Sequence, residues 1–178
     1  MSNGQQFAAK TTLKGQQALG KSMPQKMNPF VFSQALWQEC EHTYSKNPQW
    51  YISLQDSHQV NVNLLLLAQY LDQHVYFLTT EQWQILSDTI APWNNQVLVP
   101  YRQLRRIAKR HLAPDEYQKM LDVELIMERK SQQYIQQKLN TLTRPSIQHD
   151  CCSTTNVDNY LRLFSLDSKA LQYPHIIT

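Results

Sequence analysis

The chain has little glycine and no cysteine pattern of the kind that staples a fold. Only 3 of its 178 residues are glycine, whereas sandwiches and barrels need many tight turns. Its 3 cysteines are Cys40 and the adjacent Cys151 and Cys152. An odd count with this spacing fits neither a disulfide framework nor a zinc site, in which two or more residues separate paired ligands. The cysteines favour a reducing compartment, so we expect a cytoplasmic protein.

Long apolar runs and the common catalytic motifs are also missing. The longest apolar stretch, residues 64–68, is far shorter than the roughly 20 residues of a membrane-spanning helix. No basic region followed by an apolar one marks a secretory signal near the start. The sequence contains no phosphate-binding glycine loop, dinucleotide fingerprint or nucleophile elbow. We therefore expect no membrane span and no cofactor, and the pattern favours a protein that is not an enzyme.

Charge is distributed unevenly along the chain. Residues 1–29 contain four lysines and no acid, although the whole chain has a net charge of only +3. This segment is rich in polar residues and cannot bury enough apolar surface to offset the entropy of ordering, so we predict a disordered basic extension. In residues 30–140 the acids and bases nearly balance. The basic character thus belongs to the extension and not to the part that we expect to fold.

What remains predicts an all-α fold, a single compact bundle of about five to seven helices over residues 30–140. The first helix should begin at Asn28-Pro29 and end near Ser45. Further helices are predicted over 48–59, 60–73, 79–98 with an interruption or kink at Pro92, 100–112 and 114–140. Residues 60–73 are apolar on nearly all sides, which is typical of a central helix. Residues 141–178 predict a mostly irregular polar tail with a possible short docking helix at 156–166.

Five cations on one predicted helix could bind phosphates along a nucleic acid. They are Arg102, Arg105, Arg106, Lys109 and Arg110. The following helix carries five acids, among them Glu124 and Glu128, which lie four residues apart on one face. A hairpin of the two helices would pair these charges, and we favour this structural interpretation. Carboxylate metal sites in bundles repeat a Glu-x-x-His pair on facing helices, and only Glu39 and His42 have that spacing, so we predict no metal site.

A polar cluster precedes the leucine-rich segment: Asp56, His58, Asn61 and Asn63. Asp56 and His58 could act as a proton-transfer pair, because histidine titrates near neutral pH. Alternatively, these residues cap helix ends, and Asn63, which falls inside the most apolar segment, bonds to a loop or a neighbouring helix. We favour the structural roles. With Arg105, Glu124 and Glu128, the cluster forms the candidate polar site.

Several short motifs in order resemble a proteobacterial domain-of-unknown-function family of small helical proteins. The motifs are Phe30–Trp37, Ser53–Leu66, Pro92-Trp93, Leu104–Arg106 and Glu124–Glu128. The resemblance covers roughly residues 30–140 and implies a bacterial, cytoplasmic, helical protein without implying an activity. The family's pattern has glycine where Gln59 stands and aspartate where Asn61 stands. If that aspartate were catalytic, its replacement would argue against enzymatic activity here.

Three functions remain open from the sequence. The first is a protein-binding or adaptor module, which predicts an exposed apolar patch near the C-terminal tail. The second is association with RNA or the ribosome through the five cations and the N-terminal lysines, which requires the five side chains to point to solvent. The third is a small-ligand-binding protein or enzyme with a pocket formed by Asp56, His58, Asn63, Arg105 and Glu124.

Overall fold

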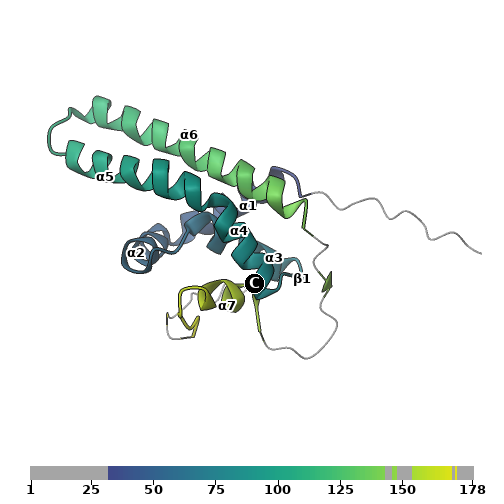
Figure 1. Ribbon diagram of the computed structural model, residues 1–178. Helices are drawn as coiled ribbons and strands as arrows, with labels where there is room; N and C mark the ends of the chain where they lie inside the picture. The colour runs from purple at the N-terminus through teal and green to yellow at the C-terminus, as the bar shows by residue number, and fades with distance from the viewer. Residues whose placement is uncertain (1–31, 143–145, 148–153, 170, 172–178) are drawn as a thin grey trace, which may run out of the picture. The chain divides into compact units, whose positions relative to one another are not determined.

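The computed structural model describes residues 32–142, 146–147, 154–169 and 171 (Figure 1). Within these residues the protein is all-α, as predicted. Its seven α-helices and one π-helical turn are α1 (Ala35–Lys46), α2 (Pro48–His58), α3 (Val62–Gln73), α4 (Thr80–Trp93), η1 (Asn94–Leu98), α5 (Val99–Ala108), α6 (Pro114–Leu139) and α7 (Asn156–Arg162). The predicted basic extension, residues 1–29, lies outside the described residues, as do Cys151 and Cys152.

Helix α3 is central to the fold, as its apolar sequence predicts. Its leucines Leu64, Leu65, Leu67 and Leu71 have no exposed surface, and α1, α2, α6 and α7 all contact it. The helix begins where the side chain of Asn61 accepts a hydrogen bond from the backbone N–H of Leu64 at 3.2 Å. A helix surrounded on every side can be apolar on every side, because no face has to meet water.

Helix α7 is part of the core. Val157, Tyr160 and Leu161 are buried, and α7 packs on α3 and α4. The carboxylate of Asp72 at the end of α3 accepts hydrogen bonds from the backbone and side-chain nitrogens of Asn156, both at 2.7 Å. Burial raises the pKa of this carboxyl, even though hydrogen bonds from Asn156 and Val157 oppose the change. The folded part of the chain therefore extends beyond residue 140, the predicted end of the domain.

Helices α4, η1 and α5 form one uninterrupted helical run. Thr79 and Gln82 make the predicted capping box at its start. Pro92 lies in the last turn of α4 and does not end the helix, since the chain continues directly as the π-helical turn η1 and then as α5. Proline removes a backbone donor, and a π-helical turn is a common way for a helix to absorb such a local change.

The predicted start of the first helix is wrong within the described residues. Residues 32–34 are not helical, and α1 begins at Ala35. The backbone of Phe32 is bonded instead to the end of α6: its N–H donates to Asn140 Oδ1 at 2.8 Å, and its carbonyl accepts from Gln136 Nε2 at 3.1 Å. These side chains satisfy the backbone groups that a helix would otherwise pair.

A two-residue antiparallel pair is the only strand pairing among the described residues. β1 (Tyr76–Phe77), which follows α3, pairs with β2 (Ser146–Ile147). It fastens the chain after α6 to the end of α3 and does not change the all-α character of the fold.

Candidate functional site

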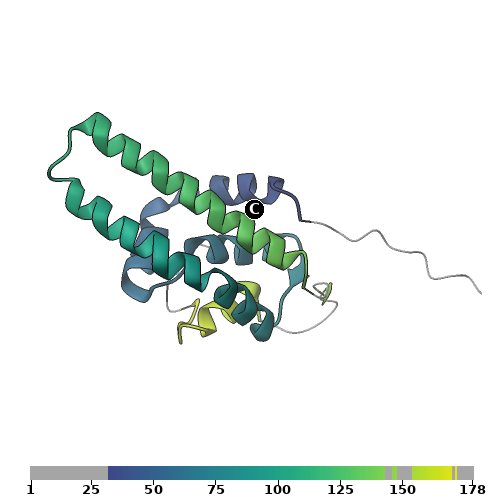
Figure 2. The same ribbon diagram turned by 45° about the horizontal axis from the view of Figure 1, so that its top comes forward.

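Helices α5 and α6 form a long antiparallel hairpin that projects from the remaining helices (Figures 1 and 2). No residue of α5 is buried. In α6 the buried residues are Ser131, Ile135 and Leu139, all in its second half. The first half of α6 and the whole of α5 therefore lie beside each other without an apolar core between them.

Ion pairs hold the inner seam of the hairpin. Arg102 pairs with Glu128 and, at 3.5 Å, with Glu124. Arg105 pairs with Glu124 and donates to the hydroxyl of Tyr117 at 2.7 Å. Burial by itself would lower the pKa of Arg105, but the hydrogen bonds to Glu124 and Tyr117 outweigh it and raise the pKa. The charges on this seam are mostly covered, so they are screened less than surface ion pairs.

Two further contacts join the hairpin to the rest of the fold. The side-chain amide of Asn63 donates to Glu128 Oε2 at 2.6 Å and accepts from Gln132 at 3.1 Å. Arg106 pairs with Asp56 at the surface. The expectation that a buried Asn63 would bond to a neighbouring helix is confirmed, and that helix is α6.

The structure brings together only part of the candidate polar site. Asn63, Glu128, Glu124 and Arg105 belong to one network through Arg102, whereas His58 is exposed at the end of α2. Asp56 and Asn61 line a small cavity that Arg102 also borders. Its volume of about 110 Å³ is below the range of about 300–1,000 Å³ usual for ligand pockets. Among the described residues, no group of three or more His, Cys, Asp or Glu side chains could hold a metal ion.

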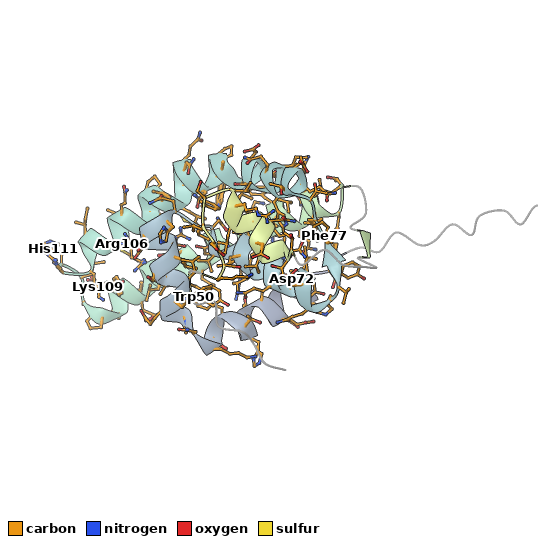
Figure 3. All side chains as sticks on the ribbon, turned by 90° about the horizontal axis from the view of Figure 1, so that it is seen from below. Trp50, Asp72, Phe77, Arg106, Lys109 and His111 are labelled. Carbon is orange, nitrogen blue, oxygen red and sulfur yellow. The ribbon has the colours of Figure 1, made fainter. Side chains whose placement is uncertain are left out.

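The five cations of the basic helix do not form one cationic surface. Arg102 and Arg105 are turned into the seam, and Arg106 is paired with Asp56. Lys109 and Arg110 are exposed, and Lys109 Nζ lies 5.8 Å from the centre of the Tyr117 ring. Figure 3 shows Lys109 and His111 at the far end of the hairpin, away from Trp50 and Asp72. The predicted pairing with acids of the following helix therefore holds for Arg102 and Arg105, two of the five cations, whereas Arg106 pairs with Asp56 of α2.

Large apolar side chains occupy the side of the hairpin opposite to these pairs. Four of them define what we call the outer stripe: Leu104 and Ile107 on α5, and Val123 and Ile126 on α6. Ile107 and Ile126 are 66% and 65% exposed. Each pair is three residues apart and so lies on one side of its helix. The expected apolar patch near the C-terminal tail is not found in the described part of that tail, because α7 buries its apolar residues in the core.

A groove of about 600 Å³ continues the outer stripe toward the end of α6. Its walls come from α4, η1 and α6, and include Trp93, Val97, Tyr134 and Lys138. The rings of Trp93 and Tyr134 meet edge to face with centres 5.8 Å apart. Trp93 Nε1 donates to the carbonyl of Met127 at 3.2 Å, which fixes the indole. Of the four tryptophans, Trp93 and Trp50 are only half-buried, whereas Trp37 and Trp83 are buried.

Helical spacing relates both rows of the stripe to the groove. Val97 and Gln137 line the same groove. Leu104 lies seven residues after Val97, and Ile107 three residues after Leu104. Ile126 lies eleven residues before Gln137, and Val123 three residues before Ile126; eleven residues are close to three full helical turns. Between the rows the hydroxyl of Tyr101 donates to the carbonyl of Met120 at 2.9 Å. The opposite side of the hairpin faces α2 and α3 through Asp56 and Asn63.

The sequence signals for this surface were present but ambiguous. Apolar residues at helical spacing mark one face of the helix predicted over residues 100–112. The pattern alone could not show that the arginines, and not the leucine and isoleucine, would face the neighbouring helix. Likewise, nothing in the spacing of Trp93 and Tyr134 distinguishes a groove wall from a core contact.

A protein-family model described as "Protein of unknown function (DUF2390)" matches residues 35–135. The matched region runs from the first residue of α1 into the last turns of α6, and so includes the hairpin. No curated protein and no solved structure matches the chain.

Gln59 and Asn61, the two positions singled out in the sequence resemblance, both fall at helix ends. Gln59 ends α2 in the left-handed conformation, with φ of 60° and ψ of 21°, which glycine adopts at lower cost. Asn61 is the N-cap of α3, a position where asparagine and aspartate serve equally well. Both residues thus have a structural role at a helix end.

Proposed function

The chain belongs to the DUF2390 family, whose description assigns no activity, and we propose that it is a protein-binding module that engages a partner through the outer stripe of the α5–α6 hairpin. The observation that carries this proposal is an inversion of the usual arrangement. The hairpin turns Arg102, Arg105, Glu124 and Glu128 inward. It turns Leu104, Ile107 and Ile126 outward.

The inversion matters because free apolar surface costs free energy in water. Single exposed apolar residues are common and need no explanation, whereas a contiguous apolar patch marks an interaction site. Here the exposed residues form two rows on one side of a rigid pair of helices, with Tyr101, Met120 and Met127 half-buried between them. Methionine adapts its shape readily and is frequent on binding surfaces. A partner that covered the rows would recover the hydrophobic free energy that the hairpin alone leaves unused.

The alternative of RNA or ribosome association has less support. It requires the cations of α5 to point to solvent, and the carboxylates of Glu124, Glu128 and Asp56 hold three of them. Phosphate contacts would have to compete with these pairs. Only Lys109 and Arg110 of the basic helix are exposed without a described carboxylate partner.

The alternative of an enzyme or small-ligand protein with a polar pocket also has less support. It predicts that Asp56, His58, Asn63, Arg105 and Glu124 line one cleft. His58 is exposed and apart from the network, and the cavity beside Asp56 is about 110 Å³. The network itself joins helices through fully engaged hydrogen bonds, which is what a structural role requires.

Our proposal includes a location in the bacterial cytoplasm, which the cysteine usage favours. Among the described residues, none of the helices combines the length and the apolar character needed to cross a bilayer.

The test is capture of partners from a nuclease-treated lysate of the source cells by tagged protein, followed by mass spectrometry. The stripe variant carries Leu104→Ser and Ile126→Ser. The matched control carries Ile52→Ser and Leu125→Ser, two other exposed apolar residues, 38% and 47% exposed; helical geometry places Leu125 about 100° around α6 from Ile126. We expect a specific protein that the wild type and the control retain and the stripe variant loses. A partner that all three chains retain equally, or material lost on nuclease treatment, would overturn the proposal.

A further inference from the structure

We infer that the groove between α4–η1 and α6 anchors an acidic amphipathic helix of the partner, and that this helix lies along the outer stripe. This inference rests on the proposed function and narrows it to one class of partner. It follows from the shape of the groove, the length of the stripe and the charges beside both.

The groove has the size and the walls of an anchor site. Its volume of about 600 Å³ falls within the usual range for pockets that take up a bound group. Trp93 and Tyr134 form aromatic walls, and the bond from Trp93 to the carbonyl of Met127 holds the indole in place. Well-packed aromatic pockets of this kind hold the large apolar side chains that dominate binding energies at protein interfaces.

The groove and stripe together suit a helix rather than an extended peptide. The outward row of α6 runs from Lys119 to Lys138, which at 1.5 Å per residue is roughly 30 Å. An extended peptide binds by pairing its backbone with unpaired backbone groups of its partner. Neither α5 nor α6 offers such groups along its length, because the backbone N–H and C=O groups inside a helix are already paired with each other. A helix laid along this surface instead turns residues i, i+3, i+4 and i+7 toward the groove and the stripe.

The charges beside the groove select an acidic partner. In the second half of α6 the exposed or half-exposed cations are Arg129, Lys130 and Lys138, and no described carboxylate forms an ion pair with any of them. Lys130 Nζ lies 5.1 Å from the centre of the Tyr134 ring, at the edge of the groove. Asp88 on α4 and Asp122 on α6 are exposed acids that accept hydrogen bonds from Gln84 and Gln118, respectively. Complementary charge would guide an acidic helix to this site and oppose a basic one.

The same charges argue against a second copy of this chain as the occupant. A two-fold dimer through this face would bring the surface containing Lys130 and Lys138 onto its own copy, and like charges at close range are unfavourable. An anionic membrane surface would also attract these lysines. However, a hollow between two helices matches the convex face of a third helix better than it matches a flat bilayer.

The test uses defined probes and titration calorimetry on the full chain. The acidic probe is an 18-residue synthetic peptide with Leu and Trp at i, i+3, i+4 and i+7 and Glu on its other face. A basic probe replaces Glu by Lys, and a scrambled probe keeps the acidic composition without the apolar face. Vesicles containing phosphatidylserine serve as the membrane probe.

The groove variant carries Lys130→Glu and Lys138→Glu. A matched control with the same change in net charge carries Lys46→Glu and Arg110→Glu, two exposed cations outside the groove and stripe. We expect the acidic probe to bind the wild type and the control alike, to bind the groove variant at least tenfold more weakly, and to shift the Trp93 indole signal in a ¹H–¹⁵N spectrum. The basic and scrambled probes should bind at least tenfold more weakly than the acidic one.

The possible failures can be told apart. Equal binding of the acidic and scrambled probes, equal loss in the groove variant and the control, or binding of vesicles in place of peptides would overturn the inference. If the acidic probe does not bind but the stripe variant still loses a protein from lysate, the partner has other chemistry and the protein-binding function stands. If neither experiment shows an effect of the stripe, both the inference and the proposed function are wrong.

Discussion

The two ends of this molecule are built on opposite principles. Around α3, Leu64, Leu65, Leu67 and Leu71 have no exposed surface, and the buried polar side chains, Asn63 and Gln69, are hydrogen-bonded. In the α5–α6 hairpin Arg102, Arg105, Glu124 and Glu128 lie in the seam between the helices, whereas Leu104, Ile107 and Ile126 are exposed. In the first region apolar burial supplies the stabilising free energy; in the second, paired charges and hydrogen bonds hold two helices together. Only the second region leaves apolar surface available for another molecule.

The largest expected effect comes from comparing one leucine in each region. Leu67→Ala removes a fully buried side chain from α3 and should lower the free energy of unfolding by about 3–5 kcal/mol, because it leaves a cavity in a packed core. Leu104→Ala removes a side chain that is 55% exposed and should change it by less than about 0.5 kcal/mol. Urea unfolding followed by circular dichroism measures both. Similar losses in the two variants would show that Leu104 packs against the fold.

A second variant tests whether charge pairing holds the hairpin. Glu124→Ala leaves Arg105, and in part Arg102, without its carboxylate partner on a mostly covered seam. We expect the free energy of unfolding to fall by about 2 kcal/mol. This is less than for a fully buried pair, because these groups keep some contact with water. The loss should be local: amide hydrogen exchange should speed up in α5 and the first half of α6 but not in α3.

Asp122→Ala is the control for this variant, since it removes an exposed acid of the same helix that accepts only from Gln118. Its effect should stay within about 0.5 kcal/mol. If Glu124→Ala sped exchange equally in α3 and α5, the hairpin and the core would unfold as one unit, and the contrast between the two regions would not extend to their stability.

These differences explain which parts of the structure could be predicted from the sequence and which could not. The leucines of α3 and the Thr79–Gln82 box predict their elements correctly, because a continuous apolar run and a local capping bond do not depend on distant residues. The clamp of Asp72 on Asn156 joins residues 84 positions apart, and no local pattern indicates it. The sequence therefore left the docking of α7 open.

The orientation of the helices in the hairpin was harder to predict for the same reason, because it depends on residues that are distant in the sequence. Alternation of arginines with Leu104 and Ile107 predicts an amphipathic helix, but which face turns inward depends on what the neighbouring helix offers. Here α6 offers Glu124 and Glu128, and the acids outweigh the usual preference for apolar contact. Opposite charges on the two helices did predict pairing, but the sequence did not show that this pairing would leave the apolar face uncovered.

A third test concerns the dependence of core stability on alkaline pH. Burial raises the pKa of Tyr51 to about 12, although the hydrogen bond to Gln69 partly opposes the change. In the unfolded chain a tyrosine ionises near pH 10, so the unfolded state loses its proton first. The stabilising contribution of Tyr51 is therefore complete below about pH 10 and is lost as the pH rises from about 10 to 12.

Urea unfolding at a series of pH values measures this loss, and absorbance at 295 nm follows tyrosine ionisation. Tyr51→Phe should lower stability at neutral pH by about 1 kcal/mol through the lost bond to Gln69 and should make the alkaline decline shallower. Burial also raises the pKa of Tyr160, so part of the decline should persist in the variant. If the free energy of unfolding fell as steeply with rising pH in Tyr51→Phe as in the wild type, Tyr51 would contribute nothing to the alkaline loss of stability.

The smallest expected effect concerns Gln59, at the link between the two regions. It ends α2 with φ of 60°, three residues after Asp56, whose carboxylate pairs with Arg106 of the hairpin. Gln59→Gly removes the steric cost of the left-handed conformation but adds backbone entropy to the unfolded chain. The net result should be a gain of about 0.5 kcal/mol, whereas the same change at Gln55, inside the helix, should cost about 1 kcal/mol. Differential scanning calorimetry of the two variants shows whether each substitution raises or lowers the stability. A loss at Gln59 would mean that its side chain, which borders the cavity with Asp56 and Arg106, supports the ion pair that ties the hairpin to α2.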